Sequence, residues 1–172
     1  DPAPRKLPER SILISATEKA ATITPNRKEK DYAFLITRYT GCRTGAANGL
    51  RHCDIDLENK TITFANWEKV VTYNKIRGGK RREKQNRRLK TAKDERTIPI
   101  STKLFEAIKD MPLNKDSDDP IWPRRYKPDD DSWGHHHSNE YRKKYGVKAH
   151  DLRAFAITKL TLEGVTPFII YE

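Results

Sequence analysis

Apolar positions recur at helical spacing along much of the chain. One run, which predicts a helix with a buried face that ends at Gly41, places apolar side chains at i, i+3, i+4 and i+7: Tyr32, Leu35, Ile36 and Tyr39. A second run predicts a helix capped by Ser101, again with one apolar face: Leu104, Phe105, Ile108 and Met111. Start and stop signals predict further helices at 43–50, 138–146 and 151–163, and a capping box at 15–18 predicts one that ends before Pro25.

Shorter segments follow the period of a strand. Residues 61–64 and 96–100 alternate apolar and polar side chains, which predicts two strands. We expect residues 88–91 to form a third strand between them, so that the basic stretch 66–87 is an insertion between the first two strands. Polar residues, with Asp and Pro clusters, predict a long loop over 113–137. The fold class is therefore mainly α (α+β), with a small antiparallel sheet.

The two ends of the chain carry their own signals. The first ten residues are rich in proline and charge, as is typical of a linker or frayed terminus, which leaves 11–172 as one domain. The chain begins with Asp1, and its single methionine is Met111. Thr166-Pro167 is a good helix start, but only five residues follow it. We therefore expect a piece of a longer protein, cut inside a helix.

Composition narrows the class of protein. The 172 residues include 35 Lys and Arg against 24 Asp and Glu, a formal net charge of +11, which suits a polyanionic partner. No apolar run approaches the roughly 20 residues that span a bilayer, which argues against a membrane protein. Cys42 and Cys53 are too few for a disulfide scaffold or a four-cysteine zinc site, and we interpret them as two buried, reduced thiols.

The positive charge is concentrated in one segment. Between Lys75 and Lys93 there are ten basic residues and one acid, Glu83, a local balance of +9, whereas the other 153 residues sum to +2. A solvated, flexible basic loop would explain this run, and Gly78-Gly79 favours it. The alternative is a hairpin that faces phosphates, and it gains support because the run leads directly into a strand-like segment.

Four short motifs follow one another along the chain. They are Thr40-Gly-Cys-Arg43, then Leu50-Arg-His-Cys-Asp-Ile-Asp56, then Leu89-Lys90-Thr91 ahead of the strand at 96–100, and finally His150-Asp-Leu-Arg153. In this order and spacing they resemble the catalytic domain of a tyrosine recombinase (phage-type integrase), from about residue 10 to the end of the chain. The resemblance implies site-specific DNA recombination or integration, in which the intact protein cleaves and rejoins strands through a 3′-phosphotyrosine intermediate.

The resemblance also implies roles for individual residues. Arg43 and Arg153 would clamp the scissile phosphate, because planar guanidinium groups match its oxygens and stay charged. His150 would hydrogen-bond the phosphate or assist proton transfer, and Lys90, with Lys93 as a rival, would protonate the leaving 5′-oxygen. The scheme requires no metal and no cofactor. Further DNA contacts are expected from the basic run: Lys84, Arg87, Arg88 and Lys93.

Two features depart from the family's pattern. Ala46 stands where the family usually has an acid that braces the first arginine, so we expect Arg43 to be braced weakly or differently. The nucleophilic tyrosine should lie farther beyond Arg153 than the nineteen residues that remain, and Tyr171 is too close to be assigned. This chain is therefore expected to bind double-stranded DNA without cleaving it. The intact protein would assemble as a homotetramer on DNA in the cytoplasm, with the nucleoid of a prokaryotic or phage host and no membrane.

Other interpretations stay open. A non-catalytic DNA-binding module derived from a recombinase would fit both Ala46 and the unassigned nucleophile, and a type IB topoisomerase-like domain or telomere resolvase would share this kind of site. The run 135–137 consists of three histidines, but consecutive side chains cannot all point at one ion in a helix or strand, which favours a solvated loop. The three tryptophans lack a repeating spacing and are interpreted as partly buried: Trp67, Trp122 and Trp133.

Overall fold

The computed structural model describes residues 7–25, 29–74, 80–88, 95–121 and 141–164, and for 66–74 and 80–88 it describes the backbone. The helices are α1 (Arg10–Ala21), α2 (Tyr32–Thr40), α3 (Thr44–Asn48), α4 (Thr102–Ile108) and α6 (Ala149–Leu162), with a helical turn at 141–145 and a 3₁₀ turn at His52–Asp54. The strands are β1 (Ile55–Asp56), β2 (Thr61–Phe64), β3 (Asn66–Asn74), β4 (Lys80–Arg88) and β5 (Arg96–Pro99). The expectation of a mainly α domain with a small antiparallel sheet is confirmed.

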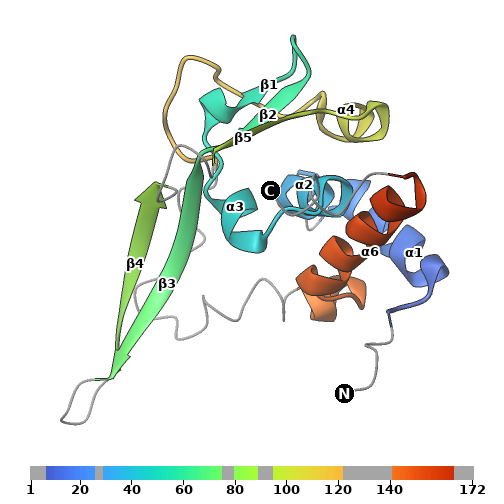
Figure 1. Ribbon diagram of the computed structural model, residues 1–172, viewed down its shortest axis with the longest axis horizontal. Helices are drawn as coiled ribbons and strands as arrows, with labels where there is room; N and C mark the ends of the chain where they lie inside the picture. The colour runs from blue at the N-terminus through green and yellow to red at the C-terminus, as the bar shows by residue number, and fades with distance from the viewer. Residues whose placement is uncertain (1–6, 26–28, 75–79, 89–94, 122–140, 165–172) are drawn as a thin grey trace.

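Helix α2 lies at the centre of the described part of the molecule, between two apolar clusters (Figure 1). One of its faces, with Phe34 and Leu35, packs against α1, α6 and the turn at 141–145. Its opposite face, with Tyr32 and Ile36, packs against the sheet and α4. Such two-sided burial explains why every residue from Tyr32 to Thr37 is buried, and it holds the C-terminal end of α2 in a fixed place.

The predicted helices form, with two differences at their starts. Helix α1 begins at Arg10, five residues before the predicted capping box, because the stripe of Leu13, Ala16 and Ala20 is buried as one face and continues the helix upstream of Ser15. Helix α6 begins at Ala149 instead of 151. The predicted cap at Ser101 is confirmed, since its hydroxyl accepts a hydrogen bond from the Leu104 amide at 3.3 Å.

In the described residues the strands pair differently from the prediction, and Arg88, expected to begin the middle strand, belongs to β4. The sheet has the order β1-β2-β5, and β2 pairs directly with β5, with Ile62 opposite Ile98. The stretch expected to be an insertion is itself a hairpin in which β3 pairs with β4, from Asn66 opposite Arg88 to Asn74 opposite Lys80. Cross-strand pairing along nine residues satisfies the backbone of the hairpin locally. The hairpin extends away from the helices (Figure 1).

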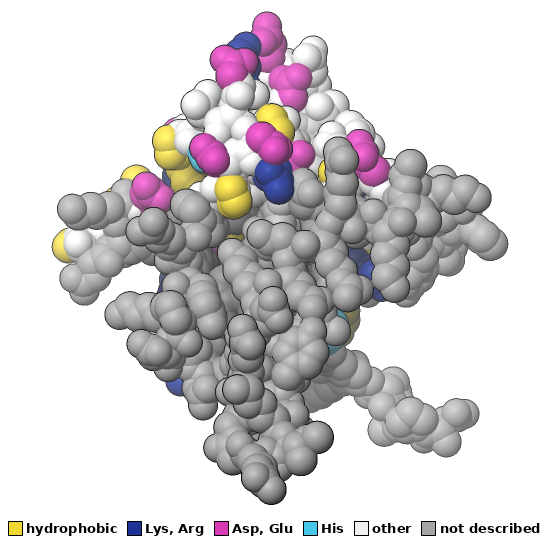
Figure 2. Space-filling model, turned by 90° about the vertical axis from the view of Figure 1, so that its left-hand side faces the viewer, with side chains coloured by type: hydrophobic (Ala, Val, Ile, Leu, Met, Phe, Trp, Pro, Cys, Tyr) yellow, Lys and Arg dark blue, Asp and Glu magenta, His cyan; other side chains and the backbone are white. Residues whose placement is uncertain are grey.

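The predicted loop after α4 is tied to the body over the part that the structure describes. The amides of His52 and Cys53 donate to the carbonyls of Asp119 and Ser117, and the Ile121 amide donates to the Leu50 carbonyl at 3.1 Å. Acidic side chains gather at this end of the molecule, as the upper part of Figure 2 shows. The described residues of the β1–β2 region and of this loop include several acids that are exposed or partly exposed: Asp54, Asp56, Glu58, Asp116, Asp118 and Asp119.

Several predictions fall on residues outside the described ranges. They concern the strand residues 89–91, the rest of the loop and the histidines at 135–137, Trp122 and Trp133, the helix start at Ser138, and everything from 165 to 172, including Tyr171. The catalytic candidate Lys90 and its rival Lys93 also lie there.

Candidate active site

The C-terminal end of α2 turns sharply at Gly41, which has φ = +67°. Its amide donates to the Thr37 carbonyl at 3.0 Å, which is the single bond of an αL helix ending. Glycine is required here because its backbone adopts a conformation that costs other residues about 1–2 kcal/mol. The turn sends the chain from α2 towards α3, and Arg43 lies two residues beyond it.

Gly41 also lies against α6. A Cβ atom added to Gly41 would stand 2.8 Å from Cβ of Ala156 and 3.7 Å from the carbonyl oxygen of Arg153. Real Cβ atoms essentially never approach another carbon to 2.8 Å, so α2 and α6 are packed too closely here for any side chain. Two small residues, Gly41 and Ala156, thus allow α2 and α6 to approach closely beside Arg153.

The two candidate arginines converge on this turn. The Nη1 atom of Arg153 donates a hydrogen bond to the Gly41 carbonyl at 2.5 Å, joining residues 112 positions apart. Arg43 is exposed and has extended backbone angles (φ −69°, ψ 145°) at the N-cap of α3. Its side chain makes no capping hydrogen bond. The guanidinium of Arg153 is therefore held at the carbonyl of Gly41, two residues before Arg43.

His150 lies in the first turn of α6. It is exposed and stands three residues before Arg153, which places both on one side of the helix. The start of α6 is fixed by Asp151, a buried carboxylate that accepts the Lys148 amide at 3.0 Å. His150 is thus exposed to solvent in the first turn of α6, one turn before Arg153.

Cys42 lies between the glycine turn and Arg43, and the residue as a whole is partly buried. Desolvation raises the pKa of its thiol, and the Thr40 hydroxyl and the positive charge of Arg153 act in the opposite direction. A raised thiol pKa leaves little thiolate at neutral pH, and the thiolate is the reactive form. Cys42 therefore packs against the apolar cluster beside the glycine turn.

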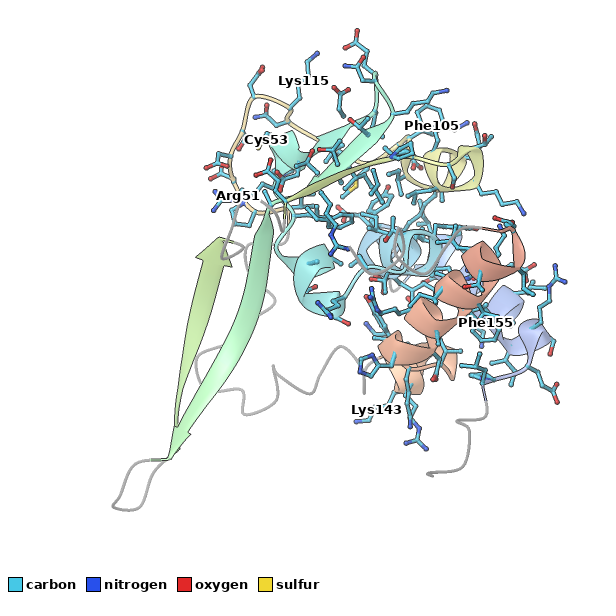
Figure 3. All side chains as sticks on the ribbon, in the orientation of Figure 1. Arg51, Cys53, Phe105, Lys115, Lys143 and Phe155 are labelled. Carbon is cyan, nitrogen blue, oxygen red and sulfur yellow. The ribbon has the colours of Figure 1, made fainter. Side chains whose placement is uncertain are left out.

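Cys53 is exposed, so the prediction of two buried thiols is wrong for this residue. It lies in the 3₁₀ turn beside the 114–121 loop, where its thiol contacts the Asp118 carboxylate at 3.7 Å. Figure 3 shows it next to Arg51 and far from Phe155 on α6. Partial desolvation and the carboxylates of Asp54 and Asp118 raise its pKa.

Ala46 offers no group that could brace Arg43. It lies within α3, is partly buried, and packs against the cluster that includes Leu50 and Ile55. Of the two arginines, Arg153 is held at a backbone carbonyl, that of Gly41. Sequence reasoning identified Gly41 as a helix end. It missed the hydrogen bond from Arg153 to the Gly41 carbonyl and the contacts of Thr40 and Ala156 at this turn, because these depend on how α2 and α6 pack.

The hairpin begins beside the same site. Strand β3 contacts α3, whose N-cap is Arg43. Of the expected DNA contacts, Lys84, Arg87 and Arg88 lie on β4, opposite Val70, Trp67 and Asn66. Lys90 and Lys93 belong to the connection from β4 to β5, outside the described residues.

The described residues contain neither a cluster of metal ligands nor a helix that could span a membrane. Among them, no three His, Cys, Asp or Glu side chains are grouped so that they could hold a metal ion. Within the same ranges, none of the helices has the length and apolar character that crossing a membrane requires.

Comparison with known proteins agrees with the motifs. The model of the phage integrase family matches residues 10–171. The fold is similar to that of the Tn1549 transposon integrase, solved in complex with circular intermediate DNA (18% identity, TM-score 0.61) and with transposon right-end DNA (18% identity, TM-score 0.62). Each match covers 99% of this chain and 58% or 57% of the other, so the chain spans just over half the length of these relatives. No curated protein shows a significant match to the sequence.

Proposed function

Because this chain belongs to the phage integrase family of tyrosine recombinases, we propose that it forms the phosphate-binding core of a site-specific DNA recombinase or integrase. In the intact protein this core would cleave one DNA strand through a 3′-phosphotyrosine link and then rejoin it to a new partner. The observation that carries the proposal is the hydrogen bond from Arg153 to the Gly41 carbonyl, which holds one arginine at the turn that presents the other.

The geometry suits the chemistry of a phosphodiester. Attack on phosphorus builds negative charge on the non-bridging oxygens, and pre-placed guanidinium groups stabilise that charge without rearranging. A guanidinium has five N–H donors in a fixed plane, so Arg153 can donate Nη1 to Gly41 and still direct other donors elsewhere. Arg43 is exposed beside it and can reach the same phosphate from the start of α3.

Two further groups would move protons. His150, exposed one turn before Arg153, is proposed to hydrogen-bond the phosphate or to assist proton transfer. Lys90 is proposed to protonate the departing 5′-oxygen. The phosphotyrosine link would retain the energy of the cleaved ester, so rejoining would need no nucleotide cofactor.

Binding and assembly complete the proposal. The hairpin segment, with +9 of the net charge between Lys75 and Lys93, is proposed to follow the phosphates of duplex DNA. The Tn1549 transposon integrase was solved with DNA, which supports this partner. We assign the nucleophile to no tyrosine of these 172 residues, and we propose that this chain alone binds DNA without cleaving it. The whole protein would act as a homotetramer on DNA in a prokaryotic cytoplasm.

A trapped covalent adduct tests the proposed function. The full-length protein that contains this chain is incubated with a nicked DNA substrate that carries its recombination site, and adducts are separated on a denaturing gel. We expect an adduct linked through a tyrosine outside residues 1–172, and a mobility shift without an adduct for residues 1–172 alone. An adduct formed by the shorter chain would contradict the assignment of the nucleophile.

The second candidate function is a non-catalytic DNA-binding module. Ala46 favours it, because no carboxylate braces Arg43 from that position. The same gel discriminates the two: DNA binding by the full-length protein with no adduct on any nicked substrate would support the module and contradict the recombinase.

A further inference from the structure

We propose that Thr40 is a positioning residue, whose hydroxyl fixes the turn that aims Arg43 while the adjacent Gly41 carbonyl fixes Arg153. The inference rests on the proposed function, since it concerns how the two arginines are held for cleavage. Thr40 itself would touch neither DNA nor the reacting atoms.

The hydroxyl of Thr40 makes two hydrogen bonds. Oγ1 donates to the Ile36 carbonyl at 2.7 Å, inside the last turn of α2. The same oxygen accepts the amide of Cys42 at 3.2 Å, beyond the end of the helix. Thr40 therefore ties the first residue after the glycine turn back to the helix it has just left.

The second bond fills a need that the helix ending creates. In an αL ending only the amide of the glycine returns to the helix, and here it does so from Gly41 to Thr37. The next amide, that of Cys42, has no acceptor within the helix ladder, and it lies in a partly buried place. Buried backbone amides need an acceptor, and the Thr40 hydroxyl supplies it.

This bond controls a direction that matters for chemistry. Cys42 is followed immediately by Arg43, whose extended backbone begins α3, so the orientation of the Cys42 peptide sets where the Arg43 side chain starts. Arg153 is tied to the carbonyl one residue earlier. Consecutive residues, Thr40 and Gly41, thus hold one arginine each, and reaction rates respond steeply to small displacements of such groups.

The experiment compares Thr40→Val, Thr40→Ser and a matched control in the full-length protein. Val keeps the branched shape and removes the hydroxyl, whereas Ser keeps the hydroxyl. Thr17→Val is the control, because Thr17 makes the same kind of bond within α1, to the Leu13 carbonyl at 2.7 Å, but it holds no amide outside its helix. Three quantities are measured: the rate of single-turnover cleavage in preformed complexes, the Kd for DNA, and the melting temperature.

We expect Thr40→Val to lower the cleavage rate by on the order of tenfold to a hundredfold with a Kd within about twofold of the parent, since only placement is lost. Thr40→Ser should cleave within about threefold of the parent, and Thr17→Val should be unaffected in cleavage. A merely structural role would lower the melting temperature of Thr40→Val and Thr17→Val alike and would leave cleavage by folded protein intact.

The proposal would be overturned if folded Thr40→Val cleaved DNA at the rate of the parent. It would also be overturned if Thr40→Ser lost tenfold in cleavage rate at an unchanged melting temperature. This second outcome tests the proposal even if Thr40→Val does not fold. Arg43→Lys is measured beside them to separate this inference from the proposed function. Full cleavage by Arg43→Lys would contradict the proposed function itself, whereas a large loss in Arg43→Lys with none in Thr40→Val would contradict only the role of Thr40.

Discussion

The junction of α2, α3 and α6 and the β3–β4 hairpin lie side by side but are built in opposite ways. At the junction, a glycine in the left-handed region meets Ala156 too closely for a side chain, and Arg153 is tied to the Gly41 carbonyl. The hairpin extends away from the helices (Figure 1), and its second strand, β4, lies within the segment 75–93 that holds most of the net charge. The junction contains few charges at fixed positions, whereas the hairpin segment contains many charges on an extended arm.

The difference separates two tasks that a DNA-cleaving protein has to perform. Stabilising a transition state requires charges whose positions are fixed before the reaction. Binding a phosphate backbone requires many charges, because each neutralised phosphate releases a counterion. We therefore infer that the junction determines the rate of cleavage and the hairpin determines affinity and its salt dependence.

Removal of the tethered arginine is the largest expected effect. Arg153→Ala in the full-length protein should lower the cleavage rate by on the order of a hundredfold to a thousandfold, as loss of one pre-placed donor does. DNA affinity should fall far less, because one charge among many is lost. Single-turnover cleavage and a binding titration measure both, and equal losses in rate and affinity would show that the two tasks are not separated.

Substitution of the glycine turn tests how tightly the junction is packed. Gly41→Ala introduces the left-handed strain and also the clash with Ala156, so we expect a loss of about 2–4 kcal/mol in the free energy of unfolding. Gly146→Ala is the control, since Gly146 has φ = +73° but its added Cβ would meet Ile12 at an ordinary 3.9 Å. Urea denaturation of residues 1–172 compares them, and equal losses would mean that the contact with α6 is unimportant.

Neutralisation of the hairpin should change affinity in a particular way. Replacement of Lys84, Arg87 and Arg88 by Ala should weaken binding to every duplex about equally and reduce the slope of log K against log salt by up to roughly 2.7, about 0.9 for each phosphate that is no longer neutralised. The control removes three positive charges away from the hairpin, by replacing three exposed lysines with Ala: Lys103, Lys109 and Lys115. Selective loss on one sequence would make the hairpin residues base readers, and an equal effect of the control would make net charge the cause.

The two cysteines give the smallest and simplest test. Cys42 is partly buried with a desolvated thiol and Cys53 is exposed, so a maleimide should label Cys53 rapidly in the folded chain and Cys42 rapidly only after unfolding. Because the pKa of each thiol is raised, labelling of Cys53 should speed up as the pH increases through and above the ordinary thiol range. Mass spectrometry with a Cys53→Ser variant identifies the site, and rapid labelling of native Cys42 would show that the junction opens.

The sequence predicted the local features of the fold well. Apolar spacing identified α2, and the hydroxyl of Ser101 identified the start of α4, because both signals lie within one element. The order of the strands was not predictable, since the pairing of Ile62 with Ile98 skips a hairpin whose second strand, β4, is polar and basic and lacks the usual alternation. The start of α1 was predicted too late, because the capping-box pattern at 15–18 lies inside the helix and has the same sequence as one at a helix start.

The candidate site divides in the same way. Arg43, His150 and Arg153 were identified from motifs, and the structure places Arg153 at the turn that leads to Arg43. The contributions of Thr40 and Ala156 were missed, because a hydroxyl bond around a turn and a contact between two helices leave no spacing in the sequence. Residue types and motifs therefore led to the candidate roles, which stay predictions, whereas the contacts that position these residues required the packing.

The central claim is that Arg43 and Arg153 act together on one phosphate, and a double-mutant cycle on cleavage tests it most directly. Arg43→Ala, Arg153→Ala and the double variant of the full-length protein are compared in single-turnover cleavage of a nicked substrate. The account predicts that the double variant loses about as much rate as the worse single variant, since residues that act as a unit are strongly non-additive. Losses that multiply, as for two independent sites, would contradict it.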